Sequence, residues 1–167
     1  EALFARLGIG RVSSLAGFLE TLKLLHVVGP LASPAIAAKS CSGGEASLVA
    51  DAAEGTAVHF PTLSDAQTQS LQAALGPLVT VSNPLDYHTF IWGDEAAMTD
   101  CFAGMMSDAV SLGIVVLDFP RPDRCTSPDW MLVLNAVEAA QAQTGKPIAV
   151  LSSIPDTMPE AVATGMV

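Results

Sequence analysis

Positive charge is scarce in this sequence. Its 167 residues carry seven Lys and Arg against 17 Asp and Glu, a formal net charge of −10 with His neutral. No stretch gathers Lys and Arg as a nucleic-acid backbone requires, so this composition argues against a nucleic-acid partner. It is compatible with one bound phosphate, because backbone N–H groups at a helix N-terminus supply a local positive field.

Long apolar runs and cysteine pairs are also missing. No run reaches the roughly 18 apolar residues that span a membrane, and no basic-then-apolar leader opens the chain. The three cysteines, Cys41, Cys101 and Cys125, include no Cys-x-x-Cys pair that would indicate a zinc site. We therefore expect reduced thiols, no metal, no membrane partner and a cytoplasmic location.

Hydrophobic residues, by contrast, make up half of the chain, and only 14% of its residues are charged. They fall in short runs that alternate with helical patterns. The runs that predict strands are residues 35–39, 56–60, 78–81, 113–118 and 147–151. The patterns that predict helices are residues 44–54, 64–75, a segment from Asp94, and residues 128–145. This alternation predicts a doubly wound α/β fold, a parallel sheet of about five strands with helices on both faces, in the flavodoxin-like order 2-1-3-4-5.

Local signals divide the chain near residue 29. Before it we expect a helix stopped by Gly8, a short strand at residues 10–12, and an amphipathic helix capped by Ser13 or Ser14. Residues 1–28 are therefore predicted to end a preceding domain, and residues 29–167 to form the main one. Because the chain starts within a helical pattern and ends without a capped element, we expect a piece of a longer protein.

A small-residue turn, Ser40-Cys41-Ser42-Gly43-Gly44, joins the first predicted strand to its helix. At the carboxyl edge of a parallel sheet such a turn meets ligands, and the free N–H groups of the next helix attract anions. We therefore predict phosphate binding by Ser42, Gly43 and Gly44, although a plain tight turn explains the residues equally well. Cys41 is the candidate reactive thiol, because a helix N-terminus lowers a thiol pKa.

A second polar turn, Asn83-Pro84-Leu85-Asp86, follows the third predicted strand. In the predicted strand order it flanks the same pocket as the first turn, so Asn83 and Asp86 would orient a ligand or brace the glycine loop. The alternative is that both only bond their own backbone, as such residues do in turns. His88 is a candidate acid or base, but an ordinary loop histidine is the favoured interpretation.

Other polar and aromatic residues receive structural interpretations. His26 and His59 are expected to be structural, and Trp92 and Trp130 to lie in the core or an interface. Asp118 ends the fourth predicted strand, and Arg121 and Arg124 follow it in a proline-rich loop. That loop could contact an anionic partner, but a solvated loop is favoured.

Three motifs, taken in order, resemble one family. They are Ser40-Cys41-Ser42-Gly43-Gly44-Glu45-Ala46-Ser47-Leu48-Val49-Ala50-Asp51, then Phe60-Pro61-Thr62-Leu63-Ser64, then Ser82-Asn83-Pro84-Leu85-Asp86. The chain is similar to NDP-forming acyl-CoA synthetases, the relatives of succinyl-CoA synthetase and ADP-forming acetyl-CoA synthetase. The segment from Phe4 to Leu25 resembles the end of that family's preceding domain.

The resemblance implies a function. Such enzymes convert a carboxylate, CoA and ATP with magnesium into acyl-CoA, ADP and phosphate, through an acyl phosphate and a phosphohistidine. Residues 29–167 would be a flavodoxin-like CoA-ligase domain whose Ser42-Gly43-Gly44 turn stabilises the phosphoryl group, as preorganised N–H groups can. The partners would be the family's CoA-binding and ATP-grasp domains, and no cofactor is assigned to this chain itself.

This chain also departs from the family's pattern. None of its three histidines lies in the Ser-His-Thr-Gly-like segment that carries the phosphohistidine, so that segment is expected upstream of Glu1 and no catalytic residue is assigned here. Glu45, in the first helical turn, would compete with a phosphate. Two rival functions stay open: an interaction or regulatory module of a protein acyltransferase fusion, and a flavin binder in which Trp92 stacks on the ring.

Overall fold

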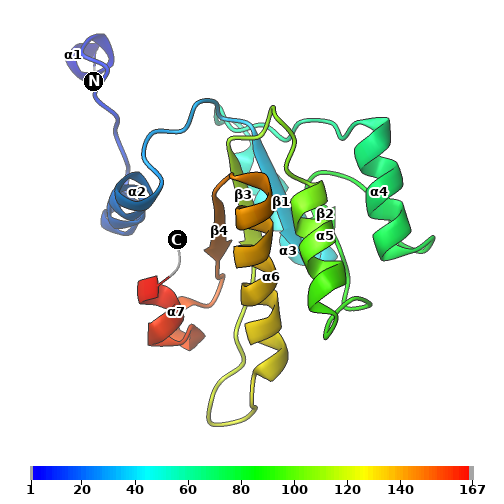
Figure 1. Cartoon of the computed structure of the whole chain (residues 1–167). Helices are drawn as coiled ribbons and strands as arrows, with labels where there is room; N and C mark the ends of the chain where they lie inside the picture. Colours follow the sequence, from blue (N-terminus) through cyan, green and yellow to red (C-terminus); the bar gives the residue numbers. More distant parts are fainter. Residues whose placement is uncertain (1, 166–167) are drawn as a thin grey trace. The chain divides into compact units, whose positions relative to one another are not determined.

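The computed structural model describes residues 2–165, and it shows an α/β fold (Figure 1). The chain divides into two compact units, with the boundary after Pro30. The first unit holds two helices, α1 (Ala2–Arg6) and α2 (Leu15–Val27). The Ser14 hydroxyl accepts a hydrogen bond from the Gly17 N–H at 3.0 Å, which confirms the predicted cap of α2. The strand expected at residues 10–12 is wrong, because these residues have no regular structure.

A parallel sheet of four described strands lies at the centre of the second unit. Its strands are β1 (Ile36–Ser40), β2 (Leu85–Asp86), β3 (Leu112–Val116) and β4 (Ile148–Leu151), in the order β2-β1-β3-β4. All three pairings are parallel, with Ser40 opposite Asp86 and Lys39 opposite Val115. Every residue of β1 is buried, as expected for the central part of a sheet covered on both faces.

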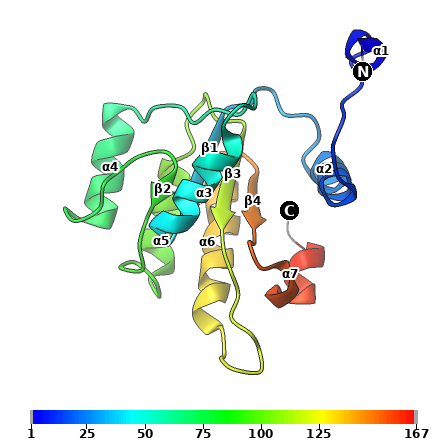
Figure 2. The same cartoon turned by 180° about the vertical axis from the view of Figure 1, so that it is seen from behind.

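Helices lie on both faces of this sheet, as the sequence predicted. The helices α5 (Glu95–Gly104) and α6 (Pro128–Thr144) cover one face, and α4 (Asp65–Leu75) packs beside α5 (Figure 1). The helix α3 (Gly43–Ala53) lies on the opposite face, over β1 and β2 (Figure 2). A 3-10 turn (Pro155–Thr157) and α7 (Glu160–Gly165) follow β4. The predicted starts of two helices are confirmed: Ser64 and Gln67 form a capping box at α4, and Pro128 stands in the first turn of α6.

The main core lies between the sheet and the helices α4, α5 and α6. Met98, Cys101 and Phe102 of α5 are fully buried in it, and each large apolar side chain contributes roughly 1.5–3 kcal/mol of burial free energy. Packing is tight at Gly113, where a Cβ atom would lie 2.9 Å from Met106 Sδ and 3.0 Å from Ile148. A glycine there lets β3 approach its neighbours closely.

Two of the five expected strands are wrong. Residues 78–81 form a turn outside the sheet, and residues 56–60 contribute a single parallel bridge between His59 and Ala35. His59 and β2 both pair with β1 along the same edge, one near each end of the strand. The expected order 2-1-3-4-5 is therefore wrong. The predicted fourth strand, observed as β3, pairs directly with β1, and no third strand lies between them.

Candidate functional site

The N-terminus of α3 emerges from a short turn at the carboxyl end of β1. The Ser40 hydroxyl donates a 2.7 Å hydrogen bond to the Ser42 carbonyl, which tightens the turn. Ser42 occupies the N-cap position, but its side chain makes no capping hydrogen bond. The two glycines that open the helix, Gly43 and Gly44, are exposed.

The first N–H groups of α3 are available to an outside acceptor. Among the described residues, none accepts a hydrogen bond from the N–H of Gly43, Gly44 or Glu45, and the first helical bond runs from Ala46 N to Ser42 O at 3.1 Å. The helices α2, α4 and α5 differ, because a Ser or Asp side chain caps each of them. Free N–H groups at a helix start carry a partial positive charge, so this end can bind an anion.

The two polar turns that the sequence predicted to be neighbours do lie side by side. Asp86 pairs with Ser40 across the β1–β2 ladder, and its Oδ2 atom lies 3.1 Å from where a Cβ atom of Gly43 would be. Its Oδ1 atom accepts a 2.9 Å hydrogen bond from the His88 backbone N–H. Asp86 thus accepts a hydrogen bond from the backbone of its own loop, as the alternative of bonding within the turn predicted. It also lies beside the first residue of α3.

His88 extends this polar cluster. Its Nε2 atom lies 3.6 Å from Asp86 Oδ2, and its ring stacks on Phe90 with 5.2 Å between centroids. His88 adopts a φ of 55°, a left-handed backbone conformation that few residues other than glycine favour. Asp86 and His88 line a groove of about 560 Å³ along one flank of α3, together with Ser47, Thr80 and Ser82.

Asn83 braces β1 through its side chain. Its Oδ1 atom accepts a 3.1 Å hydrogen bond from Ala38 N–H, and its Nδ2 group donates to the carbonyls of Ile36 at 3.0 Å and Pro61 at 3.2 Å. The carboxamide thus occupies the place of a strand residue between His59 and β2. Asn83 therefore braces β1 itself. This differs from both alternatives for its side chain that rest on local contacts, because its partners are in neither the glycine loop nor its own turn.

The environment of Cys41 opposes a reactive thiol, contrary to the expectation from its place beside a helix N-terminus. Burial raises the pKa of its half-buried thiol to about 11, and the nearby carboxylates of Glu45, Asp86 and Asp118 add to that increase. These effects outweigh the helix terminus, because desolvation and negative neighbours both oppose a thiolate. All three cysteines are free thiols, with Cys101 buried and Cys125 exposed.

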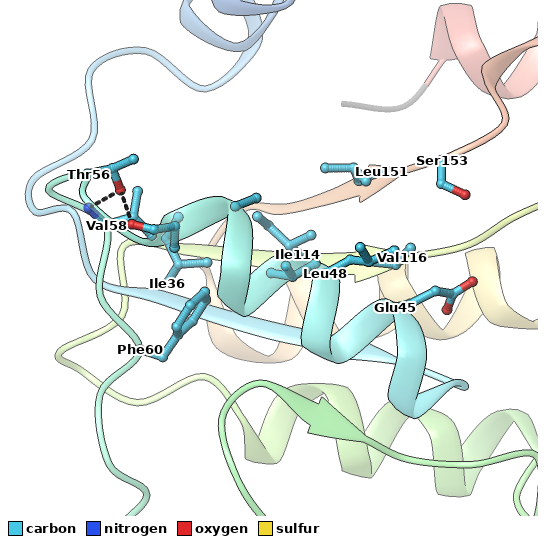
Figure 3. Close-up of a pocket in the computed structure, with 13 residues that line it drawn as sticks. Ile36, Glu45, Leu48, Thr56, Val58, Phe60, Ile114, Val116, Leu151 and Ser153 are labelled. Carbon is cyan, nitrogen blue, oxygen red and sulfur yellow. Dashed lines mark hydrogen bonds between the residues drawn. The ribbon is translucent and has the colours of Figure 1, made fainter.

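Glu45 and Asp118 lie at the same sheet edge with opposite pKa shifts. Partial burial, together with Asp118 and Asp86, raises the pKa of Glu45, whose side chain points to the flank of α3 that faces β4 (Figure 3). Partial burial acts on Asp118 too, but hydrogen bonds from Ser153 and Ser152 outweigh it and lower the Asp118 pKa. Asp118 therefore ties the loop after β3 to the loop after β4.

Sequence reasoning missed Lys39. This residue of β1 is 1% exposed, and its Nζ atom donates a 3.3 Å hydrogen bond to the Phe102 carbonyl near the end of α5. Burial lowers the Lys39 pKa to about 8, and Cys101 offsets a part of that shift. A charged residue that directly follows the apolar run Ala35 to Ala38, still within the predicted strand, is the signal that could have found it.

The remaining candidates are structural. Arg121 and Arg124 both pair with Asp123, at 2.8 and 3.6 Å, on the exposed loop, as the solvated-loop interpretation held. Trp92 packs edge-to-face on Trp130, with 4.9 Å between centroids, and the Trp130 Nε1–H donates to the Asp118 carbonyl. Within residues 2–165, no group of three His, Cys, Asp or Glu could hold a metal ion, and no helix is long and apolar enough to cross a membrane.

The fold and this edge define a flavodoxin-like α/β domain whose loops meet at the carboxyl ends of the strands. No protein-family model and no curated protein matches the sequence. Solved structures do share the fold. PH0766 from Pyrococcus horikoshii OT3 superposes with a TM-score of 0.74 at 19% identity, over 91% of this chain and 34% of that one.

The dinucleotide-forming acetyl-coenzyme A synthetase 1 of Ca. Korarchaeum cryptofilum is similar as well. Its complex with phosphate and ADP gives a TM-score of 0.71, and its apo form 0.72, each at 16% identity. Each match covers 90% of this chain and 32% of the synthetase chain. The present chain thus spans about one third of the length of these proteins, and at this identity the likeness establishes the fold.

Proposed function

We propose that this chain is a domain of an NDP-forming acyl-CoA synthetase, in which the N-terminus of α3 stabilises a phosphoryl group during transfer. The observation that carries the proposal is the uncapped start of α3, with the N–H groups of Gly43, Gly44 and Glu45 free at the carboxyl edge of the sheet. The shared fold with an acetyl-coenzyme A synthetase and the three sequence motifs support it.

In this proposal the chain stabilises the charge of the phosphoryl group and helps to position it. Preorganised N–H groups stabilise the charge that spreads over a transferring phosphoryl group, and they do so without reorganising. The exposed glycines let the phosphoryl group approach the backbone closely. Asn83 and Asp86 hold the neighbouring strand and loop in place. ATP, CoA and the phosphorylated histidine would be held by other domains of the whole enzyme.

One observation favours a second candidate function. The carboxylates of Glu45 and Asp86 lie beside the start of α3, and negative charge there opposes an incoming phosphate. A domain with a degenerate site, serving as an interaction or regulatory module of an acyltransferase-type fusion, would tolerate that charge. The raised pKa of Glu45 and the orientation of its side chain toward β4 reduce the repulsion between Glu45 and a phosphate. The carboxylate of Asp86 still opposes the phosphate.

The test is single-turnover phosphorylation of the parent synthetase with labelled phosphate donor, comparing wild type with Gly43→Asp. A carboxylate at position 43 would lie against Asp86 and repel the phosphoryl group. Loss of one preorganised donor site of this kind costs about a hundred- to thousandfold in rate. A normal rate with a normal thermal melt would overturn the phosphoryl role and favour the regulatory module.

Activity of the present chain alone gives a second check. We expect no acyl-CoA formation from CoA, ATP and a panel of carboxylates, because this chain supplies one of several proposed domains. The assay should include the parent enzyme as a positive control. Acyl-CoA formation that copurifies with this chain through several columns would contradict the proposal that other domains are required for the reaction.

A further inference from the structure

Asp86 and His88 form a pair of opposite charges beside the start of α3 whenever His88 carries a proton. The His88 Nε2 atom lies 3.6 Å from Asp86 Oδ2, and the same oxygen lies 3.1 Å from the place of a Gly43 Cβ atom. One carboxylate oxygen is therefore close to both the histidine ring and the first residue of the helix. The side chain of His88 is 41% exposed and that of Asp86 is 24% exposed, so water and ions reach both.

Asp86 is the acidic side chain that faces the helix start most directly. Glu45 lies in the first turn of α3 but points to the flank that faces β4 (Figure 3). Asp118 accepts hydrogen bonds from Ser152 and Ser153 in the loop after β4. Among the described residues that line the groove beside Asp86, His88 is the one with a basic side chain. The balance of charge in this groove therefore depends on these two residues.

The fold holds the two side chains in place before any ligand arrives. The Asp86 Oδ1 atom accepts a 2.9 Å hydrogen bond from the His88 backbone N–H, which leaves Oδ2 to the ring. Asp86 is fixed on β2 by its pairing with Ser40, and the His88 ring stacks on Phe90 with 5.2 Å between centroids. Because both side chains are already ordered, little conformational entropy is lost when they form an ion pair.

We propose that His88 is a positioning residue of the phosphoryl site: its protonated ring cancels the charge of Asp86 and so lets the start of α3 hold a dianion. The inference rests on the proposed function, in which the N–H groups of α3 bind the phosphoryl group. When the ring is neutral, the Asp86 carboxylate repels the anion at short range. When the ring is protonated, the pair has no net charge, and the helix start binds the anion more tightly.

Three other titratable side chains approach this end of the helix from neighbouring segments. They are Cys41 after β1, Glu45 on α3 and Asp118 after β3, and none of them brings a positive charge. The pKa of Cys41 is raised to about 11, so its thiol stays neutral near neutral pH. Burial, with Asp118 and Asp86, raises the pKa of Glu45. Glu45 is present in every variant below, so its contribution can be recognised.

Inorganic sulfate is the probe, because it keeps its double negative charge between about pH 6 and pH 8, the range in which histidine changes charge. The whole chain is titrated with sodium sulfate against sodium chloride of equal ionic strength. Nitrogen-15 NMR signals of the Gly43 and Gly44 amides report binding at the helix start. The wild type should bind sulfate about fivefold more tightly at about pH 6 than at about pH 8.

Two substitutions separate the charge of His88 from its place in the fold. His88→Asn removes the titratable ring, and asparagine accepts the φ of 55° at this position. It should weaken sulfate binding about fivefold at about pH 6 and abolish the pH dependence. Adding Asp86→Asn removes the carboxylate but keeps an oxygen for the backbone N–H of residue 88. The double variant should regain the wild-type affinity, because the site is then neutral without a histidine.

Asp86→Asn alone gives a test that does not depend on the folding of a His88 variant. It should bind sulfate about fivefold more tightly than the wild type at about pH 8, because no carboxylate repels the anion. His59→Asn is the matched control. His59 pairs with Ala35 at the other end of β1, so loss of its ring should leave sulfate binding unchanged. Circular-dichroism melts check that each variant is folded.

The outcomes separate this inference from the proposed function. If sulfate leaves the Gly43 and Gly44 signals of the wild type unchanged at both pH values, the anion site fails and this inference fails with it. If sulfate binds but His88→Asn binds it equally well, or the double variant stays as weak as His88→Asn, the inference alone is overturned. A pH dependence that persists in His88→Asn would assign it to Glu45 and would also overturn the role of His88.

Discussion

A carboxylate oxygen of Asp86 lies 3.1 Å from the point where Gly43 would carry a Cβ atom. This contact joins the two polar turns at the edge of the sheet, since Gly43 opens α3 and Asp86 ends β2. The contact also explains why position 43 is a glycine: there is little space for a Cβ atom. Backbone conformation does not explain it, since φ at Gly43 is not in the left-handed region. Any side chain at position 43 must displace Asp86.

Gly43→Ala should therefore destabilise the domain by about 1 kcal/mol, because the added methyl group presses on a held carboxylate. Gly44→Ala is the matched control: its Cβ atom would meet Ser42 Oγ at an ordinary 3.5 Å. There alanine should be neutral or stabilising, since it favours helices over glycine. Urea unfolding measures both. If Asp86→Ala does not reduce the cost of Gly43→Ala in a double-mutant cycle, the contact is not its cause.

Asn83→Ala should be among the most destabilising polar substitutions in this chain. It leaves the Ala38 N–H and the Ile36 carbonyl of the buried β1 without partners, at a cost of about 2–4 kcal/mol. Asn135→Ala is the control, because the Asn135 amide makes one exposed hydrogen bond, to Glu95. That substitution should cost less than about 0.5 kcal/mol. Equal losses in urea unfolding would show that Asn83 does not hold the sheet edge.

Lys39→Met should stabilise the protein at neutral pH. The native pKa of Lys39 is about 8, below the ordinary 10.5, so charged Lys39 is a cost to the fold. The cost is complete below pH 8 and is relieved as pH rises from 8 to 10.5, where the unfolded chain binds the extra proton. Removing it should add on the order of 2 kcal/mol at pH 7, after loss of the bond to the Phe102 carbonyl.

The pH dependence distinguishes this effect from simple repacking. Between pH 8 and 10.5 the wild type should gain stability relative to Lys39→Met, so the two unfolding free energies should converge. Cys101 does not obscure this comparison, because burial raises its thiol pKa to about 12. A constant difference across this range would mean that the charge on Lys39 costs the fold nothing.

The cysteines should react in the order Cys125, Cys41, Cys101. Cys125 is exposed, Cys41 is half-buried with its pKa raised to about 11, and Cys101 is buried with its pKa raised to about 12. Timed alkylation at pH 7.5–8, read by peptide mass spectrometry, gives the three rates separately. Faster labelling of Cys41 than of Cys125 would restore the reactive thiol that its place beside a helix suggested.

The sequence predicted helix ends well because their signals are local. Ser14, the Ser64–Gln67 capping box and Pro128 act within one turn of the helix that they start, so their neighbours in the chain are sufficient. The parallel sheet and its helices on both faces also followed from the alternation of apolar runs with helical patterns. The boundary between residues 28 and 29 and the roles of Ser42, Gly43 and Gly44 stay predictions.

Tertiary structure decided what depends on partners far along the chain. Residues 78–81 have an apolar pattern, yet the edge of β1 is occupied by His59, the Asn83 side chain and β2, which leaves them no pairing partner. The Cys41 pKa followed the same rule. Its position beside α3 is local, but the burial that tertiary packing imposes on the thiol is the main cause of its raised pKa, and Glu45, Asp86 and Asp118 add to it. Strand pairing and charge act through space, so a sequence pattern alone could determine neither.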